Sequence, residues 1–454
     1  MDRRSFLAAL AAGLVLPACK PARWKAGVAS VDITPRRSMW MAGFALRASA
    51  SQGVERPLHA KALVLEDGQG RRVVLVTLDL LGITTGVGQR IAAEAHRRFG
   101  LGREQLLRSS SHTHCGPVID EMLPVAYDLT EGQWRDVGAY TRELEGKVVG
   151  VIGSARRHLQ PVQLRVAEGS ATFAANRRVQ FTPRGPADHR VPVLRVDGAH
   201  GPLAIVFGYS CHNTTLRADF VRFHGDYAGV AQAELEARHP GATAMFVNGC
   251  GADANPDPRG TLDLVNRYGA DLADAVDHAG PGDVIEGPLR AACCVVDLPY
   301  APAPDRAGWT ARLEDADSYV RRHARLMLER LDRDGRLPAS QPDPVQVWRL
   351  GSGLTLVAMG GEVVVDYALR LARDYPRERL WAAGYSNDVF AYVPSLRVLR
   401  EGGYEGGGAM IYYGRPGPFD ASVEDRIHAA VRTLMDRTAG AEAWPGGSAS
   451  CPIA

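Results

Sequence analysis

The sequence predicts an α/β protein, with one large domain in which mixed β-sheets are flanked by helices. Short runs rich in valine, leucine and isoleucine alternate along the chain with longer segments whose apolar residues recur at helical spacing. The hydrophobic fraction of 46% over 454 residues is enough for a large core. Length alone also allows two or three domains. However, the Pro/Gly-rich stretches are short enough to be loops, so no linker is indicated.

The expected elements follow one another in regular order. Residues 60–65 and 73–80 are predicted strands, and residues 89–99 form a predicted helix with apolar residues at helical spacing. A further extended segment is expected from Leu106 to His114. The same order then repeats, with strands expected at 203–209 and 243–247 and helices at 228–238 and 261–278. Long helices are also expected over residues 140–157, 306–333, 363–373 and 420–437.

The first 18 residues have the features of an export signal. A charged start with Arg3 and Arg4 precedes a short apolar stretch that ends at Leu16, too short to span a membrane. The arginine pair followed by Phe-Leu resembles a twin-arginine signal, and Leu-Pro-Ala-Cys at residues 16–19 resembles a bacterial lipobox. A buried first helix is the alternative, but the abrupt change to Lys-Pro-Ala-Arg after Cys19 argues against it.

These features predict an exported bacterial lipoprotein of the periplasm or cell envelope. Residues 1–18 form the expected signal peptide, and lipidated Cys19 would attach the chain to a membrane without a spanning helix. Residues 24–437 form the expected main domain, and residues 438–454, rich in Gly, Ala, Ser and Pro, an expected loosely ordered tail.

Charge and cysteine content exclude two classes of function. The 53 basic and 51 acidic residues are scattered rather than grouped, so no electrostatic footprint for nucleic acid is present. The seven cysteines show no Cys-x-x-Cys spacing, so a zinc site built from cysteines is not expected. Most of these cysteines are better explained as small buried thiols.

Two histidines, His112 and His114, lie in the segment Ser-Ser-Ser-His-Thr-His-Cys-Gly-Pro at residues 109–117. Residues two apart in an extended chain point to the same face, so both imidazoles are expected side by side at a strand end. Imidazole is the commonest transition-metal ligand, and a loop after a strand is a common position for a site. Alone, the pair is more simply explained as two polar residues hydrogen-bonded in a loop.

Three further polar residues follow buried apolar segments. His212 comes after Phe-Gly-Tyr-Ser-Cys, where a single histidine is more often a core or loop residue than a ligand. Glu362 follows an apolar strand and a glycine pair, where a carboxylate could instead cap a helix. Tyr392 lies in Gly-Tyr-Ser-Asn-Asp-Val-Phe-Ala-Tyr-Val-Pro at residues 384–394 and could be a core aromatic residue. Each signal is therefore weak by itself.

Taken together, the four segments resemble the neutral, non-lysosomal ceramidase family in order, spacing and local sequence. That family carries His-Thr-His-Ser/Cys-Gly-Pro, a single histidine after a strand, Gly-Glu before a helix, and Asn-x-x-x-x-Tyr-Val/Ile. Further similar pieces are residues 27–35 (Gly-Val-Ala-Ser-Val-Asp-Ile-Thr-Pro), residues 41–44 (Met-Ala-Gly-Phe), Asn176-Arg177 and residues 404–406 (Tyr-Glu-Gly). The resemblance covers roughly residues 24–414.

The resemblance implies a zinc ion bound by His112, His212, Glu362 and Tyr392. Two imidazoles, a carboxylate and a phenolate form a mixed nitrogen and oxygen set that suits zinc and leaves room for a water or substrate oxygen. Zinc would make a bound water available as a nucleophile near neutral pH. His114 is then expected to act beside the metal as a proton shuttle or hydrogen-bond donor. Arg177 is expected to polarise a carbonyl or hold an oxyanion.

One feature of the family is missing. Its Gly-Asp-Val-Ser-Pro-Asn segment contains a serine that has been assigned as the nucleophile, and Asn255 stands at that position here. Either the serine chemistry is lost, or metal-activated water attacks directly and Asn255 acts as an oxyanion or substrate donor. We favour the second route because all the expected ligands and Arg177 are present. Cys250 is a candidate replacement nucleophile, although a buried inert thiol explains it better.

The predicted function is an exported zinc-dependent hydrolase that cleaves an amide bond, in ceramide or another N-acyl lipid. A small-molecule or lipid substrate is therefore the expected partner. Ceramidases carry a C-terminal β-sandwich domain that is not expected in this sequence, which weakens the transfer of the substrate more than that of the metal. The alternatives are ester or other hydrolysis at the same zinc site, and a non-catalytic ligand-binding lipoprotein of the same fold.

Overall fold

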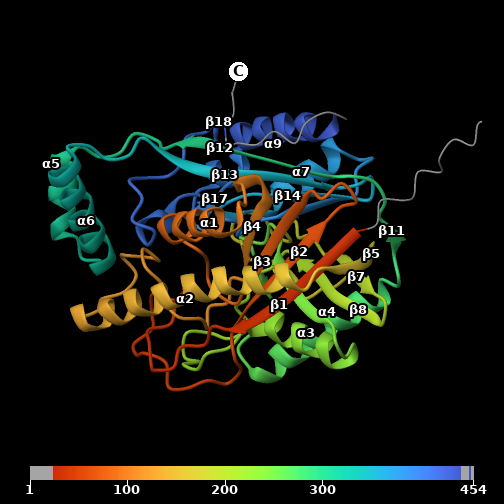
Figure 1. The fold of residues 1–454 in the computed structure, drawn as a ribbon. Coiled ribbons are helices and arrows are strands. Elements are labelled where there is room, and N and C mark those ends of the chain that lie inside the picture. Colours follow the sequence, from red (N-terminus) through yellow and green to blue (C-terminus); the bar gives the residue numbers. More distant parts are fainter. Residues whose placement is uncertain (1–23, 441–448, 451–454) are drawn as a thin grey trace, which may run out of the picture.

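The computed structural model describes residues 24–440 and 449–450 of the chain. Two β-sheets packed face to face form its centre, with helices on both outer sides (Figure 1). The expected export signal, the lipidation site Cys19 and residues 441–448 and 451–454 of the expected tail lie outside the described residues.

The larger sheet has nine strands and is mixed. The β3–β4 and β8–β9 pairs are parallel, whereas the other neighbouring pairs are antiparallel. The strand order is β4 (Leu106–Ser110), β3 (Arg72–Leu78), β2 (His59–Glu66), β1 (Trp24–Asp32), β5 (Gln160–Ser170), β7 (Arg190–Gly198), β8 (Gly201–Tyr209) and β9 (Thr243–Asn248), with β11 (Asp283–Val284) paired to β5.

The smaller sheet has five strands. Long antiparallel strands form its centre, and parallel partners flank them on both sides. The strand order is β16 (Leu380–Ala383), β14 (Leu354–Ala358), β13 (Ser340–Leu350), β12 (Leu289–Pro299) and β18 (Ala449–Ser450).

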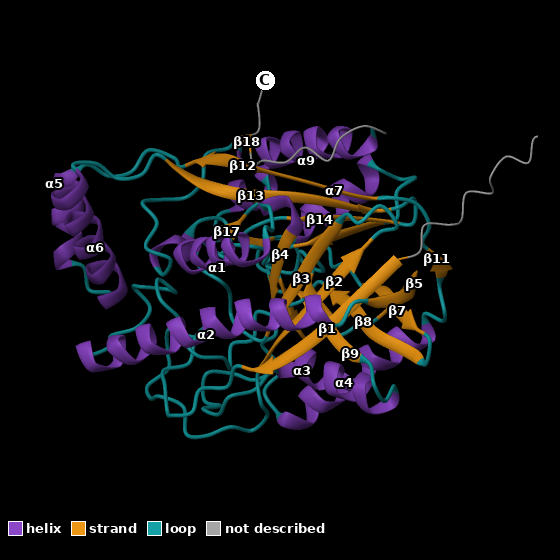
Figure 2. Cartoon of the chain, in the orientation of Figure 1, coloured by secondary structure: helices purple, strands orange, loops and turns teal. Residues whose placement is uncertain are grey.

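Helices cover the outer faces of both sheets, giving four layers (Figure 2). The larger sheet is covered by α1 (Thr85–Phe99), α2 (Glu131–Arg157), α3 (Asp226–Arg238) and α4 (Leu262–His278), and the smaller sheet by α7 (Val365–Asp374) and α9 (Val423–Ala439). A separate helical hairpin, α5 (Arg306–Ala311) and α6 (Ser318–Asp334), lies at one end of the molecule (Figure 1).

The core between the sheets follows from the alternation of side chains along each strand. In β2, Leu63 and Leu65 face the smaller sheet, where Trp348 is among their neighbours in the core. Ala62 and Val64 point the other way and belong to the core beneath the helices. Because both faces are covered, the strand is apolar nearly throughout.

Two short ladders lie outside the main sheets. One is an antiparallel pair of β6 (Ala174–Asn176) and β10 (Ala254–Pro256). The other is a parallel pair of β15 (Glu362–Val363) and β17 (Tyr392–Val393). Both ladders follow ends of the main strands, so they bring together loops that are far apart in the sequence.

The structure confirms the predicted α/β class and the predicted strands and helices, but several of them differ in extent. The helices expected to begin at residues 140 and 89 begin at Glu131 and Thr85. The helix expected over residues 306–333 is two helices, because Asp317 caps a new helix by accepting a hydrogen bond from the backbone N–H of Tyr319. The extended segment expected to reach His114 ends at Ser110. The backbone turns immediately after that strand.

Candidate metal centre

His112 lies at a sharp turn after β4. Its φ angle of 63° falls in the left-handed region, which residues other than glycine seldom adopt. Hydrogen bonds hold this conformation, because the His112 N–H donates to the Leu80 carbonyl (2.9 Å) and Nδ1 lies 2.6 Å from the Leu81 carbonyl. The His112 and His114 imidazoles do lie side by side, with their Nε2 atoms 3.3 Å apart, but the expectation that β-strand alternation brings them together is wrong. The turn itself directs the His112 imidazole inward.

His212 follows β8 and is held in the same manner. Its backbone N–H donates to the Ala254 carbonyl (3.0 Å), and its Nδ1 lies 2.9 Å from the Gly251 carbonyl. A carbonyl accepts but cannot donate, so the proton of each imidazole sits on Nδ1 and the lone pair on Nε2. Burial lowers the pKa of His212 to about 4, which keeps it neutral. Both His112 and His212 thus present Nε2 as a ligand atom.

Glu362 and Tyr392 face these imidazoles from the second short ladder, where they are directly paired residues. Glu362 Oε2 lies 3.0 Å from His112 Nε2 and 3.1 Å from His212 Nε2. The Tyr392 hydroxyl lies 3.1 Å from His212 Nε2. The other carboxylate oxygen, Oε1, accepts a hydrogen bond from Tyr413. Four side chains from four segments therefore converge on one point.

This donor set fits a cation. Once Nδ1 of His112 and of His212 carries the proton, two nitrogen lone pairs and the carboxylate oxygen of Glu362 face one another with no proton between them. Glu362 Oε2 has no hydrogen-bond partner of suitable geometry among the described residues. Such an arrangement of buried acceptors is unfavourable unless a positive charge lies among them. Mixed imidazole, carboxylate and phenol donors suit zinc.

The charge of Glu362 is consistent with this interpretation. Burial alone would raise the pKa of the carboxyl, yet positive charge and hydrogen-bond donors on the side of His112 and His212 hold it well below its usual range. Since both Nε2 atoms present lone pairs, a bound cation is the source of positive charge that fits the geometry. The side chain is almost fully buried, at 2% exposure. An ionised Glu362 side chain in a region with little access to water therefore favours a cation at this point.

His114 lies next to the same point. Its Nε2 is 3.3 Å from His112 Nε2, and its ring packs against Phe44 with centroids 4.6 Å apart. Its Nδ1 has no hydrogen-bond partner among the described residues. His112, His114 and His212 offer ligand atoms that all lie within 4.8 Å of one another, a group that could hold a metal ion. The geometry allows His114 to be either a ligand or a neighbouring proton carrier.

Arg177 reaches the centre from the end of β6. Its Nη2 donates to the Tyr392 hydroxyl (3.0 Å), Nε donates to Glu405 Oε1 (2.7 Å), and Nη1 donates to Asn255 Oδ1 (3.4 Å). Arg177 thus connects an expected metal ligand to the residue at the position of the family serine.

Asn255 lies in β10, and its amide orientation is determined by its neighbours. The amide oxygen accepts from Arg177 and from the Thr214 hydroxyl, which is 3.1 Å away. A guanidinium only donates, so the atom facing Arg177 must be the oxygen. The NH₂ group of the half-buried Asn255 consequently remains available to a ligand.

Cys250, the alternative nucleophile, is fully buried. Burial raises the pKa of its thiol well above the ordinary value, which disfavours the thiolate. These properties are those of an inert buried thiol.

Residues that sequence reasoning missed complete the surroundings of the site. Tyr413 orients Glu362, Thr214 orients Asn255, and Glu405 binds Arg177. Tyr385 packs its ring against His112, with centroids 4.4 Å apart. Glu405 and Tyr385 lay in segments that the resemblance singled out, and Thr214 lies two residues after His212, but nothing in the sequence indicated their contacts.

The described residues include no helix that is long and apolar enough to cross a bilayer.

Residues 24–257 match the sequence profile of the family described as neutral/alkaline non-lysosomal ceramidase, N-terminal. Neutral ceramidase 1 of Arabidopsis thaliana is 26% identical over 228 residues, which are 46% of this chain and 28% of that protein. Neutral ceramidase A of Dictyostelium discoideum is 23% identical over 265 residues, 52% of this chain and 36% of that protein. The matches therefore span well under half the length of these relatives.

Two solved structures share the fold. Neutral ceramidase from Pseudomonas aeruginosa superimposes with a TM-score of 0.73 at 19% identity, covering 95% of this chain and 77% of that one. A structure described as ceramidase complexed with C2 gives a TM-score of 0.71 at 18% identity, with the same coverage.

Proposed function

Because this chain belongs to the neutral/alkaline non-lysosomal ceramidase family, we propose that it is an exported zinc-dependent hydrolase that cleaves the amide bond of an N-acyl lipid. The relatives it matches are named neutral ceramidases, but it matches only part of each. Ceramide or another N-acylated lipid is the proposed substrate class.

One observation carries the proposal of a metal. The Nε2 atoms of His112 and His212 both lie within 3.1 Å of Glu362 Oε2. Both imidazoles carry their proton on Nδ1, so no proton lies between these three atoms. The Tyr392 hydroxyl supplies a fourth donor. When bound, zinc would polarise the scissile carbonyl and lower the pKa of a water molecule to about 7.

Arg177 and Asn255 are the proposed groups that bind the reacting amide. The Arg177 guanidinium places its positive charge beside the Tyr392 hydroxyl. Both hydrogen bonds that Asn255 accepts use its amide oxygen, so its NH₂ group remains available to a ligand. In these orientations the Arg177 guanidinium and the Asn255 NH₂ group can only donate hydrogen bonds. They therefore suit a carbonyl oxygen on which negative charge develops. The carbonyl would therefore be held between Arg177 and Asn255.

His114 is the proposed proton carrier. Its Nδ1 has no hydrogen-bond partner in the described part of the chain, and its other ring nitrogen is 3.3 Å from His112 Nε2. A neutral imidazole with one free nitrogen accepts the proton of an attacking water and returns it to the leaving amine. Asn255 has no hydroxyl, so a water molecule is the proposed nucleophile in place of the family serine.

Export and membrane attachment through Cys19 remain part of the proposal and rest on the signal-like sequence of residues 1–19. The described part of the chain adds one supporting observation, since Cys294 is disulfide-bonded. Disulfides persist mainly in oxidising compartments outside the cytosol.

Metal analysis together with a substrate screen tests the proposal. The wild-type protein should contain one equivalent of zinc and release fatty acid from N-acyl lipids, and His112→Ala should lose both properties. A wild-type protein that stays metal-free after incubation with zinc would contradict the proposal. Hydrolysis of esters but not amides would favour the alternative reaction, and zinc binding without any turnover would favour a ligand-binding protein.

A further inference from the structure

The Arg177 guanidinium must be held in place if it is to bind a developing negative charge. Its own main chain is fixed, because the Arg177 N–H donates to the Asp253 carbonyl (2.8 Å) beside the β6–β10 ladder. An arginine side chain is long and flexible, however, and gains precision only when its donors are saturated on the side away from the substrate. The carboxylate that pairs with it among the described residues is Glu405.

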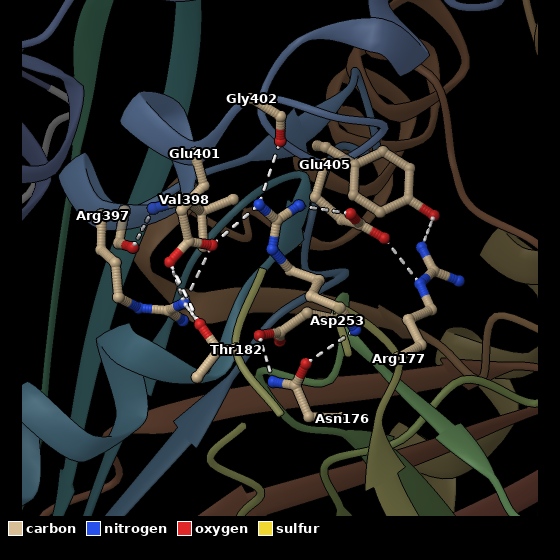
Figure 3. Close-up of polar contacts among 12 residues, drawn as sticks. Asn176, Arg177, Thr182, Asp253, Arg397, Val398, Glu401, Gly402 and Glu405 are labelled. Carbon is tan, nitrogen blue, oxygen red and sulfur yellow. Dashed lines mark hydrogen bonds and ion pairs between the residues drawn. The ribbon is translucent and has the colours of Figure 1, made fainter. Parts of the chain in front are cut away.

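Glu405 accepts one hydrogen bond from each of two consecutive arginines (Figure 3). Oε1 receives Arg177 Nε at 2.7 Å, and Oε2 receives Arg178 Nη1 at 2.6 Å. The Glu405 side chain is only 5% exposed. Burial would raise the pKa of this carboxyl, but Arg177 and the hydrogen bonds of both arginines lower it, so it is ionised.

Arg178 is in turn anchored on its far side. It is 1% exposed, and its Nη2 donates to Glu401 Oε2 (3.0 Å) and to the Gly402 carbonyl (3.0 Å) (Figure 3). Glu401 ends α8 (Leu396–Glu401) and is also bound by Arg397. A continuous series of charged hydrogen bonds thus runs from α8 through Arg178 and Glu405 to Arg177.

The main chain of this region is tied to the segment that carries Asn255. Asn176 Nδ2 donates to Asp253 Oδ2 (2.9 Å), and the Arg178 N–H donates to Asn176 Oδ1 (3.0 Å) (Figure 3). Asp253 Oδ1 also accepts from the N–H of Val365, the first residue of α7. The main chain that carries Arg177 and Arg178 is therefore held in place. The direction of the Arg177 side chain is not determined by these contacts, and Glu405 fixes it.

We propose that Glu405, buttressed by Arg178, is a positioning residue that aims the Arg177 guanidinium at Tyr392 and Asn255. The consequence for catalysis rests on the proposed function, in which Arg177 binds the reacting carbonyl. The positioning itself does not rest on it, because it concerns side-chain contacts alone. Loss of the carboxylate would leave two neighbouring arginines without their shared counter-charge.

Glu405→Gln tests the positioning, since it keeps the shape and removes the charge. The first measurement is the ¹⁵Nε–¹Hε NMR signal of Arg177 in metal-free protein, assigned by its disappearance in Arg177→Lys. We expect this signal to shift and to lose protection from solvent exchange in Glu405→Gln. Glu378→Gln is the matched control, because Glu378 pairs with Arg349 in a half-buried ion pair and hydrogen-bonds Thr355 at the start of β14, away from the centre. An unchanged Arg177 signal in Glu405→Gln would overturn the proposal.

The second measurement is hydrolysis of an N-acyl substrate. We expect kcat to fall roughly 10- to 100-fold in Glu405→Gln, with unchanged zinc content, while Glu378→Gln keeps wild-type kcat. Glu405→Asp retains the charge and should recover part of the loss, which separates positioning from simple destabilisation. A shifted Arg177 signal with unchanged kcat would support the positioning and overturn its proposed consequence for catalysis.

A double-mutant cycle decides whether Glu405 acts through Arg177. In the Arg177→Lys background, Glu405→Gln should cause little further loss of kcat, because its target is already altered. Losses that multiply would show an independent role and contradict the proposal. If the wild-type protein hydrolyses no N-acyl substrate, the proposed function fails, and the NMR signal then decides the positioning by itself.

Discussion

The hydroxyl of Tyr413 donates a hydrogen bond to Oε1 of Glu362 and thereby leaves Oε2 directed at His112 and His212. Such outer hydrogen bonds fix the orientation of a metal ligand and raise the affinity of the site.

Tyr413→Phe should weaken zinc binding roughly 10- to 100-fold, because Glu362 would lose the contact that orients its carboxylate. Competition with a chromophoric chelator measures this affinity. Tyr412→Phe is the control, since Tyr412 is the neighbouring tyrosine and contacts other rings rather than Glu362. Equal zinc affinity in Tyr413→Phe and the wild type would contradict the assigned role.

Zinc should stabilise the wild-type protein against unfolding and leave His112→Ala unaffected. A ligand that binds only the folded state adds about 2.7 kcal/mol at a free concentration of 100 times its Kd. Thermal melts with zinc and with excess chelator measure the difference for each protein. A zinc-dependent rise in Tm that persists in His112→Ala would place the metal elsewhere.

Asn255→Ser should keep zinc binding and should not be required for basal turnover. Asn255→Ala removes the donor NH₂ and should lower kcat by about 10²-fold, the usual cost of losing one oxyanion donor. Steady-state kinetics on an N-acyl substrate compares the three proteins. If the wild type is inert and Asn255→Ser alone restores hydrolysis, water is not the nucleophile in this chemistry.

Cys250→Ala should leave both kcat and zinc content unchanged, because the thiol is fully buried and burial disfavours its ionisation. Treatment of the wild type with iodoacetamide should likewise leave hydrolysis intact. Loss of turnover in Cys250→Ala with normal folding would revive the thiol as nucleophile.

Stability should depend on pH through Asp343. Burial raises the pKa of this carboxyl to about 7, although the N–H of Gly360 donates to it. An aspartate in the unfolded chain has a pKa of about 4. The folded state therefore binds more protons between these values, and the contribution of Asp343 to stability falls as the pH rises from about 4 to about 7.

Asp343→Asn should remove this pH dependence. The free energy of unfolding of Asp343→Asn, relative to that of the wild type, should therefore be higher at pH 8 than at pH 5. Urea unfolding at both values gives the comparison. Asp297→Asn, at an exposed position of β12, is the control. A difference between wild type and Asp343→Asn that is the same at both pH values would refute the assignment.

Much of the fold was predictable because apolar periodicity is strong where both faces of a strand or one face of a helix are buried. The convergence of His112, His212, Glu362 and Tyr392 was also anticipated, because the resemblance of their four segments to the ceramidase family implied it. The left-handed turn at His112 was not, because it depends on hydrogen bonds to the carbonyls of Leu80 and Leu81 from a different strand end. Tyr413 and Glu405 lie in a loop without periodicity, so nothing local indicated their contacts.

The four converging side chains come from segments spread between residues 112 and 392, and two of them meet only through the β15–β17 ladder. Contacts between such distant segments form late in folding, because long loops must close first. The unfolded chain therefore does not hold these four side chains together, in contrast to small domains that fold around their metal. Zinc binding therefore indicates that the four distant segments have assembled. A refolding protein should acquire zinc only in its last kinetic phase. A protein proposed to leave the cytoplasm already folded would then bind zinc only after it had folded correctly. Zinc binding before export would thus distinguish folded from misfolded chains.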